Sequence, residues 1–307
     1  MAIQYPPFLK KKDCIGITCP AGFLAPGKAD RCIETLQKWG FEVMVGRTVH
    51  STSTNYFAGT ESERLQELQA MLDHPDIRAI LCGRGGYGVS QLLDQLDFRA
   101  FKKHPKWIIG FSDITALHLH LNRKLKTASI HASMAAAFQD SQAGSLRIQN
   151  IRKLLTGMHT RISADPHPLN QKGIAEGELI GGNLTLIAHL IGTSSAVSTR
   201  GKILFIEDIG EYIYSSDRMF LQLKRAGLLN ELAGLIVGGF TDMKDTERPF
   251  GSDIYTAISR QLGTVSYPVC FGFPISHGEQ NMPVISGGMY QLRVGKTVTL
   301  NPLTTIS

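Results

Sequence analysis

The chain has 307 residues, of which 43% are hydrophobic and 19% charged, and its formal net charge is +6. This composition is that of a folded protein with one large or two medium domains, and no apolar run approaches the ~20 residues that span a bilayer. The basic excess has its longest run at residues 10–12, so it argues against a nucleic-acid partner and favours small anionic substrates.

Two further features bear on location and cofactors. The basic residues 10–12 follow a proline-containing segment, whereas a signal peptide places them before its apolar stretch, so we expect a cytoplasmic protein without membrane contact. The five cysteines include no CxxC pair, which argues against a thiolate zinc site. We expect neither a metal nor another cofactor.

The first half alternates short apolar runs with segments of helical periodicity. Thr60 and Glu63 form a predicted capping box at the start of one helix. Expected strands, in chain order, cover residues 13–19, 41–45, 77–82 and 107–110, with helices at 29–39, from 60 onward, 89–96 and 114–121. Alternation of this kind predicts a parallel sheet with helices on both faces, whose ligands bind at the carboxyl ends of the strands.

The pattern breaks in a polar, turn-rich stretch, which we interpret as a linker over residues 158–176 between an N-terminal domain (1–157) and a C-terminal domain (177–307). Asn183 is expected to cap a helix in the second domain. Further expected elements are strands at 202–206, 235–239 and 269–273, a helix at 217–225, and a hairpin at 290–300 that turns near residue 295. The predicted fold class is therefore α/β, with a parallel N-terminal sheet and a mixed C-terminal α/β domain.

Ser112 follows the apolar run 107–110 and precedes a predicted helix. A serine on such a turn exposes its hydroxyl and places backbone N–H groups near a developing oxyanion. The segment lacks the second glycine of the G-x-S-x-G elbow, because Ile114 stands there. By itself the segment favours a serine that merely caps the helix over a nucleophile.

The loop 83–88 holds four glycines at the end of a predicted strand. Glycines allow the backbone to approach a ligand and to direct N–H groups at negative charge. The loop is neither a Walker A loop nor a Rossmann fingerprint, and a tight turn without function is the alternative. As part of an oxyanion hole, it would act with the N–H of Asp113.

A serine nucleophile needs a base, and His277 is the best placed of ten histidines because it lies in a loop after a predicted strand. His118 lies on the helix after Ser112 and points away from the turn, which favours a structural role. Candidates for the orienting acid are Glu207, Asp208 and Glu211, and the residues alone do not rank them.

Taken together, these segments resemble the LD-carboxypeptidases, the muramoyltetrapeptide carboxypeptidases of murein recycling. The resemblance covers nearly the whole chain. Its most specific part is Arg-Gly-Gly-Tyr-Gly at 84–88 followed by Gly-Phe-Ser-Asp at 110–113, and it also includes residues 57–64, 181–184, 206–211 and 277–280.

The resemblance implies a flavodoxin- or amidotransferase-like N-terminal domain, a separate C-terminal domain, a homodimer and no metal. It implies a catalytic triad of Ser112, His277 and Glu207, with Asp208 and Glu211 as competitors for the acid. The implied reaction is hydrolysis of the bond between the L-centre of a diamino acid and a terminal D-alanine in murein tetrapeptide. The amides of Gly86 and Asp113 would hold the oxyanion, and Arg84 is a candidate ligand for the substrate carboxylate.

Two other functions compete with this one. A branch of the same family acts on acyl-sulfamoyl or phosphoramidate conjugates in microcin immunity, with the same triad and a remodelled pocket. A protein with two α/β domains could also bind a ligand without catalysis.

Overall fold

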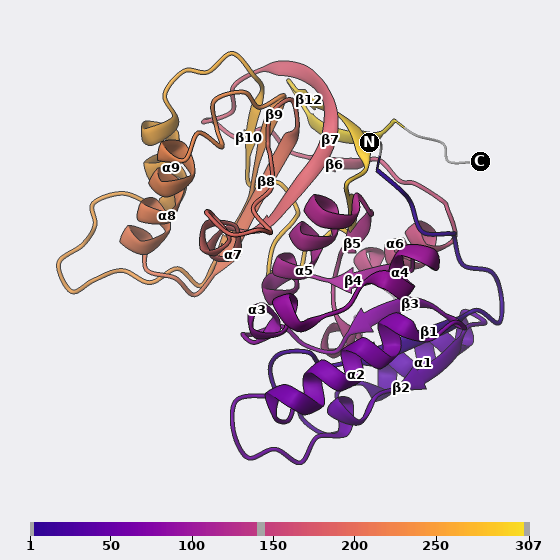
Figure 1. The fold of residues 1–307 in the computed structure, drawn as a ribbon. Helices are drawn as coiled ribbons and strands as arrows, with labels where there is room; N and C mark the ends of the chain where they lie inside the picture. Colours follow the sequence, from indigo (N-terminus) through magenta and orange to yellow (C-terminus); the bar gives the residue numbers. More distant parts are fainter. Residues whose placement is uncertain (1–2, 140–144, 304–307) are drawn as a thin grey trace. The chain divides into compact units, whose positions relative to one another are not determined.

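The computed structural model describes residues 3–139 and 145–303 and divides the chain into two compact units (Figure 1). Unit 1 takes the described residues up to Met158 together with Pro283–Ile285. Unit 2 takes His159–Met282 and the described residues from Ser286 onward. No helix within the described ranges is long and apolar enough to cross a membrane.

Unit 1 contains a six-stranded sheet in the order β11-β5-β4-β3-β1-β2. Its strands are β1 (Cys14–Thr18), β2 (Glu42–Val45), β3 (Ile77–Cys82), β4 (Trp107–Gly110), β5 (Ser129–His131) and β11 (Val284–Ser286). The neighbouring pairs from β2 to β5 are all parallel, so their carboxyl ends lie along one edge. β11 is contributed by a segment far along the chain, which returns to this sheet beside β5.

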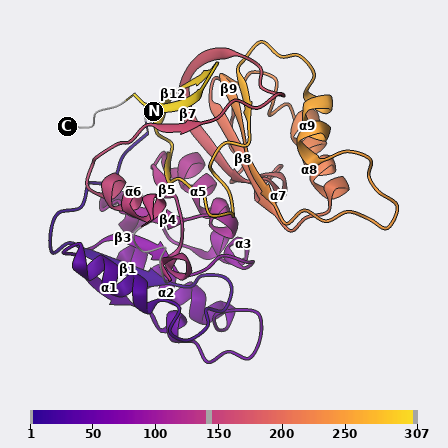
Figure 2. The ribbon, with the colours of Figure 1, turned by 180° about the vertical axis from the view of Figure 1, so that it is seen from behind.

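Helices cover both faces of this sheet, as the opposite views of Figures 1 and 2 show. They are α1 (Asp30–Lys38), α2 (Glu61–Asp73), α3 (Val89–Leu92), α4 (Arg99–Lys103), α5 (Thr115–His120) and α6 (Leu146–Leu155), with shorter turns at Arg47–His50, Leu93–Gln95, Ser112–Ile114, Leu121–Leu125 and Ala135–Phe138. Ile15 and Ile17 of β1 pack in the core that also holds α1 and α6. Gly16, between them, faces the other side, where a Cβ atom would lie 2.9 Å from the sulfur of Met71 in α2.

Unit 2 contains a seven-stranded mixed sheet in the order β10-β9-β8-β7-β12-β13-β6. Its strands are β6 (Ile162–Ala164), β7 (Gly173–Asn183), β8 (Ile203–Ile209), β9 (Gly234–Thr241), β10 (Val269–Phe271), β12 (Met289–Val294) and β13 (Val298–Pro302). The long strand β7 pairs antiparallel with β12 through its first half and parallel with β8 through its second half. It thereby joins an antiparallel region to a parallel one.

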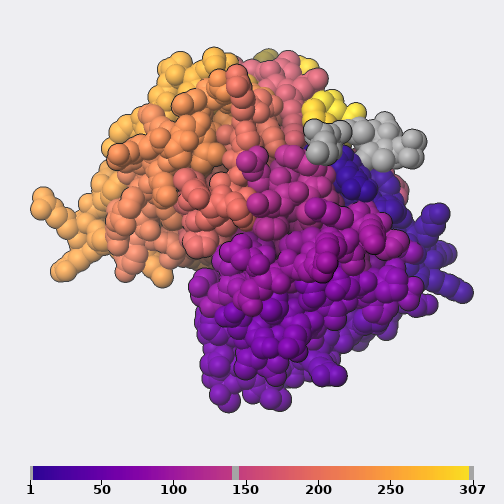
Figure 3. Space-filling model, in the orientation of Figure 1, coloured from indigo at the N-terminus to yellow at the C-terminus, as the bar shows by residue number. Residues whose placement is uncertain are grey.

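Three helices complete unit 2, namely α7 (Leu184–His189), α8 (Ile213–Arg225) and α9 (Ile254–Leu262). Asn183 caps α7, because its side chain accepts a hydrogen bond from the Leu186 N–H at 3.2 Å. The loop from β9 to α9 is exposed over residues 244–251, and its orange atoms project at the left of Figure 3.

The structure confirms the predicted fold class of a parallel N-terminal sheet and a mixed C-terminal α/β unit. The capping box at Thr60 and Glu63, the cap at Asn183 and the hairpin of β12 and β13 are present as predicted. The segment 158–176, interpreted as a linker, contains β6 and the first residues of β7. These residues pair with β13 and β12, which lie more than a hundred residues further along the chain.

Candidate active site

Ser112 lies at the sharp turn where β4 ends and the helical segment of α5 begins. Its backbone has a φ of +61°, a left-handed conformation that only four described residues other than glycine adopt. This conformation costs a non-glycine residue about 1–3 kcal/mol, and it persists where the surroundings enforce it. A left-handed serine on a sharp strand-to-helix turn is the backbone geometry expected of a nucleophile at such a position.

The glycine-rich loop 83–88 lies against this turn. A Cβ atom on Gly85 would be 3.1 Å from the Ser112 Cβ and 3.3 Å from its Oγ, so a side chain there would press on Ser112. Gly86 and Gly88 have φ values of +102° and +145°, which side chains rarely permit. The loop therefore brings its backbone to the serine hydroxyl, as an oxyanion-binding loop must.

Two buried charges hold the segment that follows this loop. The Asp113 carboxylate, 1% exposed, accepts a hydrogen bond from the Val89 N–H at 2.9 Å. Arg64 of α2, also 1% exposed, donates to the Gly88 carbonyl at 3.3 Å and to the Pro20 carbonyl at 2.8 Å. Burial raises the pKa of Asp113 to about 6, while the Val89 N–H and the charge of Arg64 act in the opposite direction.

Arg84 and His118 are bound to the main chain of unit 1. The Arg84 guanidinium donates to the Phe23 carbonyl at 2.5 Å, and the rest of its side chain is exposed. His118 is fully buried with Nε2 2.9 Å from the Gly110 carbonyl oxygen, and burial lowers its pKa to about 4. His118 is thus a structural residue of α5, as predicted.

In unit 2, Glu207 and His277 form a close pair. Nδ1 of His277 lies 2.5 Å from Oε2 of Glu207, whose side chain is fully buried. Burial raises the pKa of Glu207, and the hydrogen bond from His277 partly offsets this effect. A carboxylate in this position fixes the orientation of the imidazole and stabilises its charged form.

Asp208, the residue after Glu207, is held by groups at the start of α7. Its carboxylate accepts hydrogen bonds from Asn183 Nδ2 at 2.7 Å and from the N–H and hydroxyl of Thr185 at 3.0 and 2.9 Å. Asp208 therefore anchors the start of α7, and of the three candidate acids Glu207 is the one paired with His277.

Glycines of β9 allow the His277 loop to reach Glu207. The pairing of β8 with β9 shifts register between Ile206 and Asp208, a bulge at the position of Glu207. A Cβ atom on Gly239 would collide with Ser276, at 2.3 Å from its Cβ, and the Gly239 N–H donates to the Ile275 carbonyl at 2.9 Å. The missing side chain lets the loop cross the end of β9.

Comparison with known proteins shows the family. A model of the LD-carboxypeptidase N-terminal domain matches residues 15–132, and a model of the LD-carboxypeptidase C-terminal domain matches residues 176–292. The chain belongs to the LD-carboxypeptidase family. A Bacillus subtilis (strain 168) protein named "Probable murein peptide carboxypeptidase" is 32% identical over 285 residues, which cover 92% of this chain and 89% of the relative.

Two further relatives carry different names. The crystal structure of muramoyltetrapeptide carboxypeptidase from Oxalobacter formigenes is 28% identical and superposes with a TM-score of 0.85 over 94% of this chain and 98% of that one. The microcin C7 self-immunity protein MccF of Escherichia coli is 28% identical and is matched over 90% of each chain.

This LD-carboxypeptidase family member thus has two separate local arrangements. Unit 1 holds Ser112, the glycine loop and the supporting charges, and unit 2 holds Glu207 and His277. Sequence reasoning assigned no role to Arg64 or to the Asp113 carboxylate. The signal for Arg64 was a charged residue on the apolar face of α2, beside Leu68, Met71 and Leu72.

Proposed function

We propose that this protein is a serine carboxypeptidase that releases the terminal D-alanine from murein tetrapeptide. The observation that carries the proposal is the contact of 2.5 Å between His277 and the buried Glu207. A serine hydroxyl needs a neighbouring base, and a histidine oriented by a buried carboxylate is the arrangement that supplies one. The names of the related murein peptide carboxypeptidases support the choice of substrate.

In this proposal Ser112 of unit 1 and His277 of unit 2 act on one bond. The connectivity of the chain supports it, because the segment from His277 to Val284 leads directly into β11 of the unit 1 sheet. At no more than ~3.6 Å per residue this segment spans at most about 25 Å. β11 neighbours β5, which neighbours β4, the strand that ends before Ser112.

The reaction follows from the roles of these groups. Ser112 Oγ attacks the carbonyl carbon of the L-configured diamino acid, and His277 Nε2 takes the hydroxyl proton. The N–H groups of Gly86 and Asp113 stabilise the oxyanion, and Glu207 stabilises the imidazolium. Collapse expels D-alanine, whose amine takes the proton from His277, and water then hydrolyses the acyl–Ser112 ester with His277 again acting as the base.

The terminal carboxylate of the substrate requires a cation or N–H donors. Arg84 remains our candidate, because it lies in the loop beside Gly85 and Gly86. Its contact with the Phe23 carbonyl uses one arm of the guanidinium and holds the side chain near that loop.

The test is the release of free D-alanine from purified murein tetrapeptide. We expect release by the wild-type protein, none by Ser112→Ala, and labelling of Ser112 by a fluorophosphonate. Undiminished release by Ser112→Ala would contradict the mechanism, and binding of the peptide without labelling or release would favour a binding protein. An aminoacyl-sulfamoyl adenosine in the same assay tests the MccF-like alternative, which cleavage of that compound alone would favour.

A further inference from the structure

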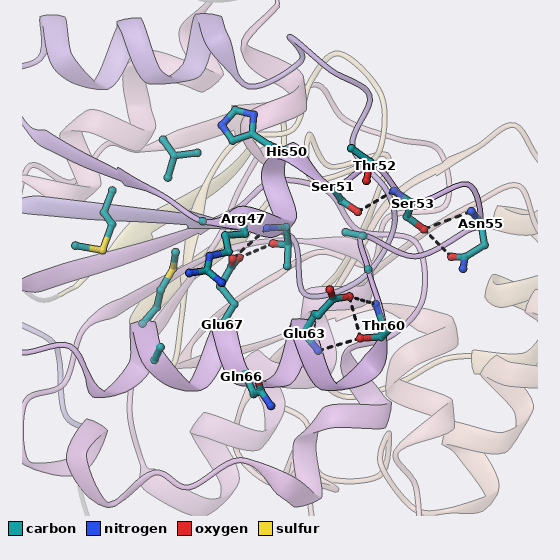
Figure 4. A pocket seen from close by; sticks show the side chains of 18 of the residues that line it. Arg47, His50, Ser51, Thr52, Ser53, Asn55, Thr60, Glu63, Gln66 and Glu67 are labelled. Carbon is teal, nitrogen blue, oxygen red and sulfur yellow. Dashed lines mark hydrogen bonds between the residues drawn. The ribbon is translucent and has the colours of Figure 1, made fainter.

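A cavity in unit 1 lies beside the edge strand β2 and along α2 (Figure 4). Its volume is about 840 Å³, within the range of small-molecule pockets. It lies between the end of β2, the turn Arg47–His50, the loop that follows and one side of α2. Nothing in the proposed triad uses these residues.

The wall of this cavity is rich in hydroxyl and amide groups. Figure 4 shows the side chains of Ser51, Ser53 and Asn55 on one side and those of Arg47 and Glu67 on another. Its polar lining residues are Arg47, Thr48, His50, Ser51, Thr52, Ser53, Thr54, Asn55, Thr60, Glu63, Gln66, Glu67 and His74. Such a lining suits a ligand that carries many hydroxyl and amide groups.

Internal hydrogen bonds connect the side chains of the wall and occupy the carboxylate of Glu67. The Ser53 N–H donates to Ser51 Oγ at 3.1 Å, and the Ser53 hydroxyl donates to Asn55 Oδ1 at 3.0 Å. Glu67 accepts hydrogen bonds from the Thr48 N–H at 3.0 Å and from the Thr18 hydroxyl at 2.7 Å. Its carboxylate is therefore occupied by the protein itself.

Arg47 supplies the positive charge of the cavity. Among the residues that the structure describes, its guanidinium forms no ion pair. A single guanidinium beside hydroxyl and amide groups matches a sugar that bears one carbonyl-containing side arm.

Contacts within unit 1 connect the cavity loop to the glycine loop beside Ser112. Tyr56 follows the cavity loop, and its hydroxyl lies 2.7 Å from the position of a Cβ atom on Gly86. Gly85 in turn lies against Ser112. Three strand steps, from β4 through β3 and β1 to β2, separate the two places, or ~14 Å at the usual spacing.

That separation matches the substrate of the proposed function, on which this inference rests. A muramoyl tetrapeptide carries its sugar at the amino end, three residues before the scissile bond. Three extended residues span ~10 Å, and the lactyl arm of the sugar adds to this length. We infer that the cavity beside β2 binds the muramoyl sugar of the substrate.

The experiment compares two substrates, muramoyl tetrapeptide and the same tetrapeptide without the sugar. We expect the wild-type protein to cleave the sugar-bearing substrate with at least tenfold higher kcat/KM. Gln66→Trp, an exposed position on α2 that fills the cavity, should abolish this preference through KM and leave cleavage of the sugar-free peptide unchanged. Arg47→Ala should weaken the preference, and Arg123→Ala, an exposed arginine outside the cavity, should keep it.

Calorimetric titration with N-acetylmuramic acid separates this inference from the proposed function. Saturable binding that Gln66→Trp abolishes supports the sugar site even if neither substrate releases D-alanine, an outcome that would refute only the proposed function. Equal cleavage of both substrates by the wild type, or a preference that survives in Gln66→Trp, would overturn the inference. So would a titration in which inorganic phosphate binds and the sugar does not.

Discussion

Arg64 is the residue whose replacement should most clearly reveal how the glycine loop is held. It is a fully buried cation that donates hydrogen bonds to the carbonyl oxygens of Pro20 and Gly88. It donates a third hydrogen bond to Gln91 Oε1 at 2.9 Å, and its guanidinium carbon lies 4.6 Å from the centre of the Phe57 ring. Arg64→Met keeps most of the packing volume but removes the charge and all of these hydrogen bonds.

The expected loss can be worked from these contacts. Two buried carbonyl oxygens lose their charged donor, at about 1–3 kcal/mol each, and Asp113 loses a neighbouring positive charge. Together these losses should lower the free energy of unfolding by about 4 kcal/mol. The pKa of Asp113 should rise further, because Arg64 lowers it.

The assay is urea unfolding followed by tryptophan fluorescence. Trp39 and Trp107 are the two tryptophans of the chain and both lie in unit 1, so the signal reports the unit that contains Arg64. Arg64→Lys keeps the positive charge but lacks the planar guanidinium with its several N–H donors, so its free energy of unfolding should fall by about half as much. Arg123→Met, an exposed control, should stay within about 0.5 kcal/mol. A loss below about 1 kcal/mol for Arg64→Met would refute this account of the loop.

Three further predictions follow from the site. Ser112 has a positive φ, so the Ser112→Gly protein should be about 1 kcal/mol more stable than the Ser112→Ala protein in the same urea assay, and both should be inactive. Equal stability of the two variants would show that the backbone at Ser112 is not strained. Glu207→Gln should lower the rate of D-alanine release about 10²–10⁴-fold with little change in KM. Asp208→Ala should instead lower the melting temperature measured by circular dichroism, because it removes the anchor of α7. The reverse pattern would show that Asp208, and not Glu207, is the acid of the triad. Burial raises the pKa of Asp113 to about 6, so the folded protein holds a proton there that the unfolded chain releases, and stability falls as pH rises from 4 to 6. Burial lowers the pKa of His118 to about 4, so the unfolded chain takes up a proton there before the folded protein does. The stability of the protein therefore falls as pH falls from 6.5 towards 4, which is the opposite sign to the effect of Asp113. At about 3 kcal/mol each, these two effects should nearly cancel. Relative to the wild type, the stability of Asp113→Asn should therefore rise with pH in this window and that of His118→Gln should fall; parallel curves would contradict both assignments.

Much of the fold could be predicted because it depends on local patterns. Apolar runs, the capping residue Thr60 and the cap at Asn183 act over a few neighbours, and they place β1 to β4 and the helices between them. β11 and β7 could not be predicted from the sequence, because both depend on distant parts of the chain. β11 is a strand of three residues that joins a sheet formed far earlier in the chain, and β7 depends on partners more than twenty residues away on one side and a hundred on the other.

The site shows the same division between local and distant determinants. Ser112 stands out locally, since a serine between an apolar strand and a helix is a short-range pattern. The choice among Glu207, Asp208 and Glu211 depends on which of the three carboxylates the His277 loop reaches. That in turn depends on the bulge in β8 and β9 and on the missing side chain of Gly239. Only the assembled sheet of unit 2 contains this information.

Several costly features of this fold lie at or beside the residues that the proposed mechanism uses. Ser112 holds a left-handed backbone, and burial raises the pKa of the carboxyl groups of Asp113 and Glu207, so that ionising either one works against folding. A single substitution would remove each of these unfavourable features, namely Ser112→Gly for the left-handed backbone and Asp113→Asn and Glu207→Gln for the buried carboxyl groups. If strain and buried charge are retained because they orient the nucleophile, the loop and the base, then all three replacements should stabilise the fold at neutral pH and all three should slow D-alanine release. A replacement that stabilises the protein and leaves the rate unchanged would show that its position serves something other than this reaction.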